Sequence, residues 1–201
     1  MRIKICGITT PEDAIAAVAA GADAIGVISC SPESRRNLPD TRVREIFSAV
    51  GAGVVRAIVT HTTDPDELQA VCALCPDEIQ MSYPFPRSMV PSSIRVVRVI
   101  SPSMPVPDDC DGGVIVDASM GKGKRYDPAY SVSVRKRAKV PVYLAGGLTP
   151  ENVSEAVRSI CPDGVDVATG VEVSPGVKDH IKIRAFIRAV RDAEASRKKC
   201  E

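Results

Sequence analysis

Two side chains that could move a proton each stand at the end of an apolar segment. Cys6 lies near the end of residues 2–8 (RIKICGI), and Asp117 lies near the end of residues 112–118 (GGVIVDA). A thiolate can serve as a base or nucleophile, and a protonated carboxyl group can serve as an acid. If the fold brings both to one pocket, they could move a proton on and off one small substrate. Otherwise Cys6 is a small apolar filler and Asp117 a loop residue.

Two glycine-containing loops could bind a phosphate group. They are residues 144–153 (LAGGLTPENV) and 166–172 (DVATGVE), and each is expected to place glycine just before a helix start. Exposed backbone N–H groups and the positive end of a helix dipole attract anions at such a point. The phosphate candidates are Gly146, Gly147, Thr169 and Gly170.

Two arginines could bind a carboxylate. Arg35 and Arg36 stand in residues 31–40 (SPESRRNLPD). A guanidinium group can grip a carboxylate through two parallel hydrogen bonds. From spacing alone, solvated loop arginines are an equally good interpretation.

The cysteines and histidines form no pattern of metal ligands. Cys72 and Cys75 make a C-x-x-C inside residues 64–78, which have a helical pattern, and no second pair completes a tetrahedral zinc site. His61 could support the site or be a solvated loop residue, and His180 is expected at the surface. We expect no metal.

The elements that position these residues alternate along the chain. Apolar runs are expected as buried parallel strands, because several are apolar at consecutive positions, as in strands covered by helices. Helix signals separate them: Thr and Pro open a helix that ends at Gly21, and Thr149 with Pro150 open another. The eight expected strands are residues 2–8, 23–29, 54–59, 77–82, 94–100, 112–118, 140–147 and 164–169.

Eight such alternations most simply close into a (β/α)₈ barrel. The connection 101–111 (SPSMPVPDDCD) is short and rich in proline, so the fifth helix is expected to be short or missing. We expect one α/β domain over residues 1–201, with residues 195–201 as a frayed tail.

In a barrel of this type the position of a residue along its strand predicts where it lies, because reactive residues sit at the C-terminal ends of the strands. Cys6 and Asp117 would face one mouth from opposite sides, and the arginines would overhang it. The loops after the seventh and eighth strands are the recurring phosphate site of this fold. Lys4 lies two residues before Cys6 on the same strand and away from the rim, so we do not expect it to help ionise the thiol.

Composition limits the partners. The chain has 201 residues, a formal charge of +1 and 44% hydrophobic residues, which does not suit binding to nucleic acid by counterion release. No apolar run approaches the length that spans a bilayer. Seven scattered cysteines are expected to be reduced thiols, so a cytoplasmic location is expected.

The sequence resembles the phosphoribosylanthranilate isomerases of tryptophan biosynthesis over nearly its whole length. The resemblance implies an Amadori rearrangement of N-(5-phosphoribosyl)anthranilate, without cofactor or metal, in a monomer or homodimer. The segments that carry it are KICGIT, GADAIGVI, SRRNLP, LAGGLTPENV and GVDVATGVEVSPGVKD.

The same resemblance implies a role for each site residue. Asp117 would be the general acid, Cys6 the general base and Arg36 the ligand of the anthranilate carboxylate. Gly121 and Gly123 of GKGKRYD would join the phosphate site, although this loop departs from the family pattern. A second departure is Ser82, which stands where the family has histidine.

Two rival interpretations remain. One is a related sugar isomerase of the histidine-pathway or dual-substrate type. Those enzymes use a pair of aspartates, and a cysteine at the first strand, Cys6, argues against this interpretation. The other is a barrel that has kept the phosphate site as a sensor or scaffold without catalysis.

Overall fold

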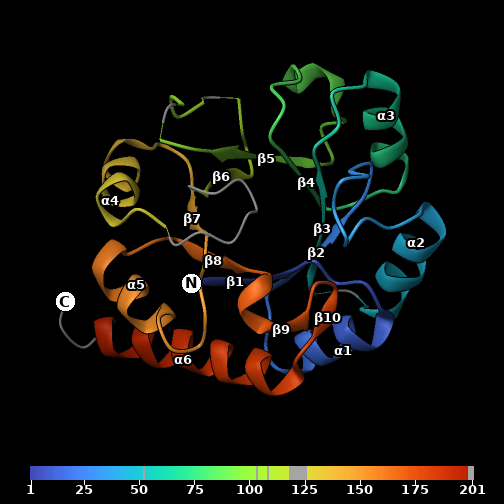
Figure 1. The fold of residues 1–201 in the computed structure, drawn as a ribbon. Coiled ribbons are helices and arrows are strands. Elements are labelled where there is room, and N and C mark those ends of the chain that lie inside the picture. Colours follow the sequence, from blue (N-terminus) through green and yellow to red (C-terminus); the bar gives the residue numbers. More distant parts are fainter. Residues whose placement is uncertain (52, 103, 108, 118–125, 199–201) are drawn as a thin grey trace.

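The computed structural model describes all residues except 52, 103, 108, 118–125 and 199–201. Its eight parallel strands close into a barrel in chain order (Figure 1), which confirms the predicted fold. The strands are β1 Arg2–Cys6, β2 Ala24–Ile28, β3 Val55–Thr60, β4 Glu78–Met81, β5 Arg95–Ile100, β6 Gly113–Val116, β7 Val142–Leu144 and β8 Gly164–Val167.

Helices surround the barrel (Figure 1). The first begins as the sequence indicates, since the Thr10 side chain caps it by accepting from the Asp13 N–H and Pro11 occupies its first position. No helix of the described residues is long and apolar enough to cross a membrane. The helices are α1 Pro11–Ala19, α2 Asp40–Ala49, α3 Pro65–Ala73, α4 Pro128–Arg137, α5 Val153–Ile160 and α6 His180–Lys198.

Two connections on one side of the barrel have no regular α-helix in their described residues. Between β5 and β6 the described residues form no helix, as predicted. Between β4 and β5 the chain makes only a one-turn 3₁₀ helix, Arg87–Met89, which the sequence analysis missed. Prolines at positions 84, 86 and 91 prevent a longer helix there. Arg98 also holds this segment by donating to the carbonyl oxygens of Tyr83, at 3.0 Å, and Phe85.

Two helix ends differ from expectation. The helix predicted to start at Pro150 begins at Val153, because the Asn152 side chain binds the preceding turn. It accepts from the Thr149 N–H at 2.9 Å and donates to the Gly147 carbonyl at 2.9 Å. At the other end of the chain, residues 195–198 continue α6, and residues 199–201 lie outside the described part.

Strand residues alternate between the barrel interior and the layer under the helices. Ile3 and Ile5 of β1 face the helices and are fully buried. Arg2, Lys4 and Cys6 therefore face inward, one above another. The same alternation on the other strands decides which side chains reach the mouth.

Candidate active site

Cys6 and Asp117 both lie at the carboxyl-end face of the barrel. Cys6 is the last residue of β1, and Asp117 directly follows β6, where its N–H donates to the Ile100 carbonyl at 3.2 Å. Asp117 has the phase of Ile115, which lines the barrel interior. Since β8 and β7 separate β1 from β6 in the ring, the two side chains approach the mouth from well-separated strands.

The Cys6 thiol sits in an apolar pocket with charges nearby. It packs with Ile28, Val59 and Ala168 and is only 7% exposed. Burial raises the pKa of the thiol, and the positive charges of Lys4 and Lys178 only partly offset this.

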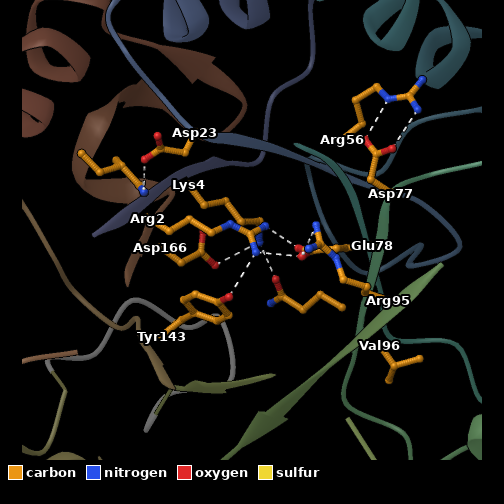
Figure 2. Close-up of polar contacts among 12 residues, drawn as sticks. Arg2, Lys4, Asp23, Arg56, Asp77, Glu78, Arg95, Val96, Tyr143 and Asp166 are labelled. Carbon is orange, nitrogen blue, oxygen red and sulfur yellow. Dashed lines mark hydrogen bonds and ion pairs between the residues drawn. The ribbon is translucent and has the colours of Figure 1, made fainter. Parts of the chain in front are cut away.

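Lys4 was not expected to help ionise the thiol, but its ammonium lies close to the sulfur. A Cβ atom built on Gly26 would lie 2.8 Å from Lys4 Cε and 2.9 Å from Cys6 Sγ, so both side chains crowd against this glycine. Gly26 is the register partner of Cys6 on β2. The Lys4 ammonium donates to Asp166 at 3.1 Å and to Gln80. Figure 2 shows Lys4 beside Asp166 inside the barrel.

A second buried network lies deeper in the barrel, below Lys4. The Arg2 guanidinium forms an ion pair with Glu78 and donates to the Tyr143 hydroxyl at 3.2 Å (Figure 2). Arg2 binds both Glu78 oxygens, and Arg95 pairs at 3.0 Å with Oε1, which also accepts from Arg2 at 2.7 Å. Because it lies at the amino ends of β1, β4 and β5, this network is structural and separate from the mouth.

Arg36 reaches the mouth beside Cys6 but is already paired. Its Nε and Nη2 donate to the two carboxylate oxygens of Glu172 at 2.8 and 2.6 Å, and Nη2 approaches the Thr169 hydroxyl at 3.4 Å. Its aliphatic part lies across Gly7, where a Cβ would be 2.5 Å from Arg36 Cδ. Nη1 has no hydrogen bond to a described residue. Arg35 is exposed.

Glu172 and Lys178 are site residues that were not predicted from the sequence. They belong to a hairpin, β9 Glu172–Ser174 and β10 Val177–Lys178, that follows β8. The Lys178 ammonium donates to Glu172 at 2.8 Å and to the Cys6 carbonyl at 2.6 Å. The sequence did hold a signal for this pair, because a Ser-Pro-Gly turn separates Glu172 from Lys178. A hairpin with such a turn brings the two charged residues face to face.

The glycines proposed for phosphate binding form two adjoining loops. Gly146 and Gly147 have positive φ angles of 95° and 59°. A Cβ on Gly170 would lie 1.9 Å from the Leu148 carbonyl oxygen, so only glycine allows the two loops to pack this closely. Gly121 and Gly123 lie outside the described residues.

The prediction that a helix begins directly after these glycines is wrong. After β7, α5 begins only at Val153. After β8, Thr169 opens a 3₁₀ turn of three residues, and α6 follows only after the hairpin. Loop backbone, and not the end of a long helix, therefore lines this part of the mouth.

His61 and Ser82, which follow β3 and β4, meet on the side of the barrel opposite β7 and β8. The His61 Nδ1 and Ser82 Oγ atoms are 3.1 Å apart. Burial lowers the pKa of His61, whereas the negative charge of Asp117 acts in the opposite direction. Among the described residues, no three side chains of the His, Cys, Asp or Glu types gather as metal ligands.

Comparison with known proteins identifies the family. The family model described as N-(5'phosphoribosyl)anthranilate (PRA) isomerase matches residues 3–189. N-(5'-phosphoribosyl)anthranilate isomerase of Methanoregula boonei is 57% identical over 194 residues, which cover 96% of this chain and 98% of the relative. The crystal structure of phosphoribosyl anthranilate isomerase from Thermus thermophilus has 32% identity and a TM-score of 0.85, covering 96% of this chain and 99% of that one.

A further solved structure carries a ligand. It is a phosphoribosyl anthranilate isomerase in complex with reduced 1-(o-carboxyphenylamino)-1-deoxyribulose 5-phosphate. It has 28% identity and a TM-score of 0.80, over 96% of this chain and 99% of that one. Sequence, fold and family model agree, and the chain belongs to the N-(5'-phosphoribosyl)anthranilate isomerase family.

Proposed function

We propose that this chain converts N-(5'-phosphoribosyl)anthranilate to 1-(2-carboxyphenylamino)-1-deoxyribulose 5-phosphate in tryptophan biosynthesis. Membership of the family makes the chain an isomerase. The observation that carries the residue roles is the position of Cys6 and Asp117 at the carboxyl ends of β1 and β6, on one mouth. A thiol and a carboxyl group so placed can act on two atoms of one sugar.

The reaction needs one proton donor and one proton acceptor. Asp117 protonates the ring oxygen of the ribose, and the ring opens to a Schiff base. Cys6, as the thiolate, removes the proton from C2′ to give an enolamine, which tautomerises to the ketone. Substrate and product are isomers, so the sequence of steps consumes no oxidant or reductant.

Arg36 and the glycine loops hold the two ends of the substrate. Glu172 fixes the plane of the Arg36 guanidinium from one side, and the Nη1 edge is available to the anthranilate carboxylate. The backbone at Gly146, Gly147, Thr169 and Gly170 receives the phosphate, together with Gly121 and Gly123. Binding at both ends positions the sugar between Cys6 and Asp117.

Turnover of the two acid–base variants tests this proposal. The substrate is a fluorescent anthranilate derivative, and the chain has no tryptophan, so its decay can be followed directly. Cys6→Ser and Asp117→Asn should each lower kcat/KM by about 100-fold or more, because each removes a general acid or base. Cys161→Ser is the matched control, since this thiol is exposed at the end of α5. Wild-type kcat/KM in either test variant would remove that residue from the mechanism.

We also infer a cytoplasmic location and action on small molecules alone. No disulfide joins the six cysteines that the structure describes, as in proteins of a reducing compartment. A phosphorylated sugar is an ionised metabolite that is retained in that compartment. Both a monomer and a homodimer would carry this site, because all of its described residues come from one chain.

A further inference from the structure

The proposed base, Cys6, must become a thiolate inside a pocket that disfavours its charge. Its neighbours in the pocket are the apolar side chains of Ile28, Val59 and Ala168. Burial alone therefore works against the proposed chemistry. Some nearby group has to supply compensating positive charge.

Charged groups face the sulfur from three sides. Lys4 lies below it on β1, with Asp166 of β8 behind that ammonium. Lys178 of β10 binds the Cys6 carbonyl, and Arg36 crosses the adjacent glycine. Glu172 pairs with both of these cations. Three cations and two carboxylates leave one net positive charge, which a Cys6 thiolate would neutralise.

Lys4 is the cation that approaches the sulfur from within the barrel. The point where a Gly26 Cβ would stand is 3.3 Å from Lys4 Nζ and 2.9 Å from Cys6 Sγ. Both residues are buried, Lys4 to 6% exposure, so water screens their interaction little. Asp166 and Gln80 hold the ammonium in place, and the second Asp166 oxygen has no hydrogen-bond partner among the described residues.

We propose that Lys4, held by Asp166 and Gln80, is a positioning residue whose charge beside the sulfur allows Cys6 to form its thiolate. This inference rests on the proposed role of Cys6 as the base. It assigns Lys4 no contact with substrate. Gly26 is part of the arrangement, because any side chain on it would separate the ammonium from the sulfur.

The ionisation of Cys6 can be measured without turnover. The rate at which iodoacetamide alkylates Cys6 is followed against pH by mass spectrometry, with exposed Cys161 as the internal reference. Lys4→Met should lower the Cys6 rate near neutral pH by about tenfold and move its titration to higher pH, because a nearby cation favours the thiolate. Lys136→Met, on the exposed face of α4, should leave it unchanged.

A double variant separates charge from folding. Lys4→Met leaves Asp166 as an unpaired buried carboxylate, which both destabilises the protein and opposes the thiolate. Lys4→Met with Asp166→Asn removes both charges, so its alkylation rate should lie between those of Lys4→Met and the wild type. If Lys4→Met does not fold, the double variant carries the test alone. A wild-type titration of Cys6 in the folded variants overturns the inference.

Turnover then distinguishes this inference from the proposed function. If Cys6 is the base, the acidic limb of the kcat/KM profile should move to higher pH in Lys4→Met along with the alkylation curve, and activity should recover at alkaline pH. A merely structural role for Lys4 lowers kcat/KM equally at every pH. A shifted alkylation curve with an unshifted kcat/KM profile supports Lys4 as the partner of Cys6 and rejects Cys6 as the base.

Discussion

Glu172 is the residue on which the geometry of the mouth depends most visibly. Its carboxylate pairs with Arg36 and Lys178, and its side chain is 2% exposed. Burial opposes its charge, but the two cations outweigh burial and hold the pKa of Glu172 below its usual value. One carboxylate therefore orients both the proposed substrate ligand and the cation at the Cys6 carbonyl.

Glu172→Gln should loosen Arg36 and raise KM for the substrate several-fold, with a smaller change in kcat, because Arg36 contributes binding more than chemistry. The free energy of unfolding in urea should fall by about 2 kcal/mol, since buried Lys178 and partly buried Arg36 lose their counter-charge. Steady-state kinetics and urea titration measure the two effects. Glu33→Gln, exposed in the Arg36 loop, is the control. An unchanged KM would show that Glu172 does not position Arg36.

The loss of unfolding free energy in Glu172→Gln should depend on pH, and the direction of this dependence follows from the lowered pKa of Glu172. A carboxylate with a depressed pKa in the folded state contributes stability that is present above its unfolded pKa. That contribution is lost as pH falls through the folded-state pKa. The difference in unfolding free energy between wild type and Glu172→Gln should therefore shrink on acidification.

A residue at the mouth could be predicted from the sequence only where its chemical type and its place at the end of a strand identified it. Cys6 and Asp117 were found this way, because strand ends in a barrel converge on one face. Lys4 was judged too far from the rim, although it stands on the same face of β1 as Cys6. Glu172 and Lys178 were missed because their contacts join distant parts of the chain: Lys178 and Cys6 are 172 residues apart. No local pattern in the sequence carries such a pairing.

At the scale of elements, the loops after β7 and β8 form one unit through Gly170. Gly170→Ala should lower the free energy of unfolding by about 2 kcal/mol or more, because its Cβ would collide with the Leu148 carbonyl at 1.9 Å. It should also weaken inhibition by inorganic phosphate, since the two loops would separate. Urea titration and inhibition kinetics measure these effects.

Gly51→Ala is the control for this substitution. Gly51 has a φ of 42°, and nothing lies within 4 Å of an added Cβ, so its cost should be about 1 kcal/mol from backbone strain alone. Equal stability losses in the two variants, with unchanged phosphate inhibition, would contradict the packing of the loops through Gly170.

The elements themselves were largely predictable from local pattern. All eight strands overlap the predicted apolar runs, and proline in residues 101–111 indicated the missing helix. The start of α5 was not predictable, because Pro150 is a normal helix-opening signal, whereas the Asn152 side chain binds the turn and delays the helix. Between β4 and β5 only the single turn Arg87–Met89 forms, because the prolines around it exclude a regular helix.

At the scale of the molecule, closure of the barrel brings the proposed acid and base together. Cys6 and Asp117 are far apart in sequence, and no direct strand pairing joins β1 to β6. They share a mouth only because β1 also pairs with β8, with four residues of each strand in register. The account therefore depends on where one bound sugar lies between them.

A crystal structure of this chain with reduced 1-(o-carboxyphenylamino)-1-deoxyribulose 5-phosphate tests that directly. We expect the Cys6 sulfur at about 3.5 Å from carbon 2 of the sugar, Asp117 on its opposite side near the ring-oxygen position, and the phosphate at Gly146 and Gly170. A sugar whose carbon 2 lies out of reach of the sulfur, with Asp117 turned away from it, would contradict the account.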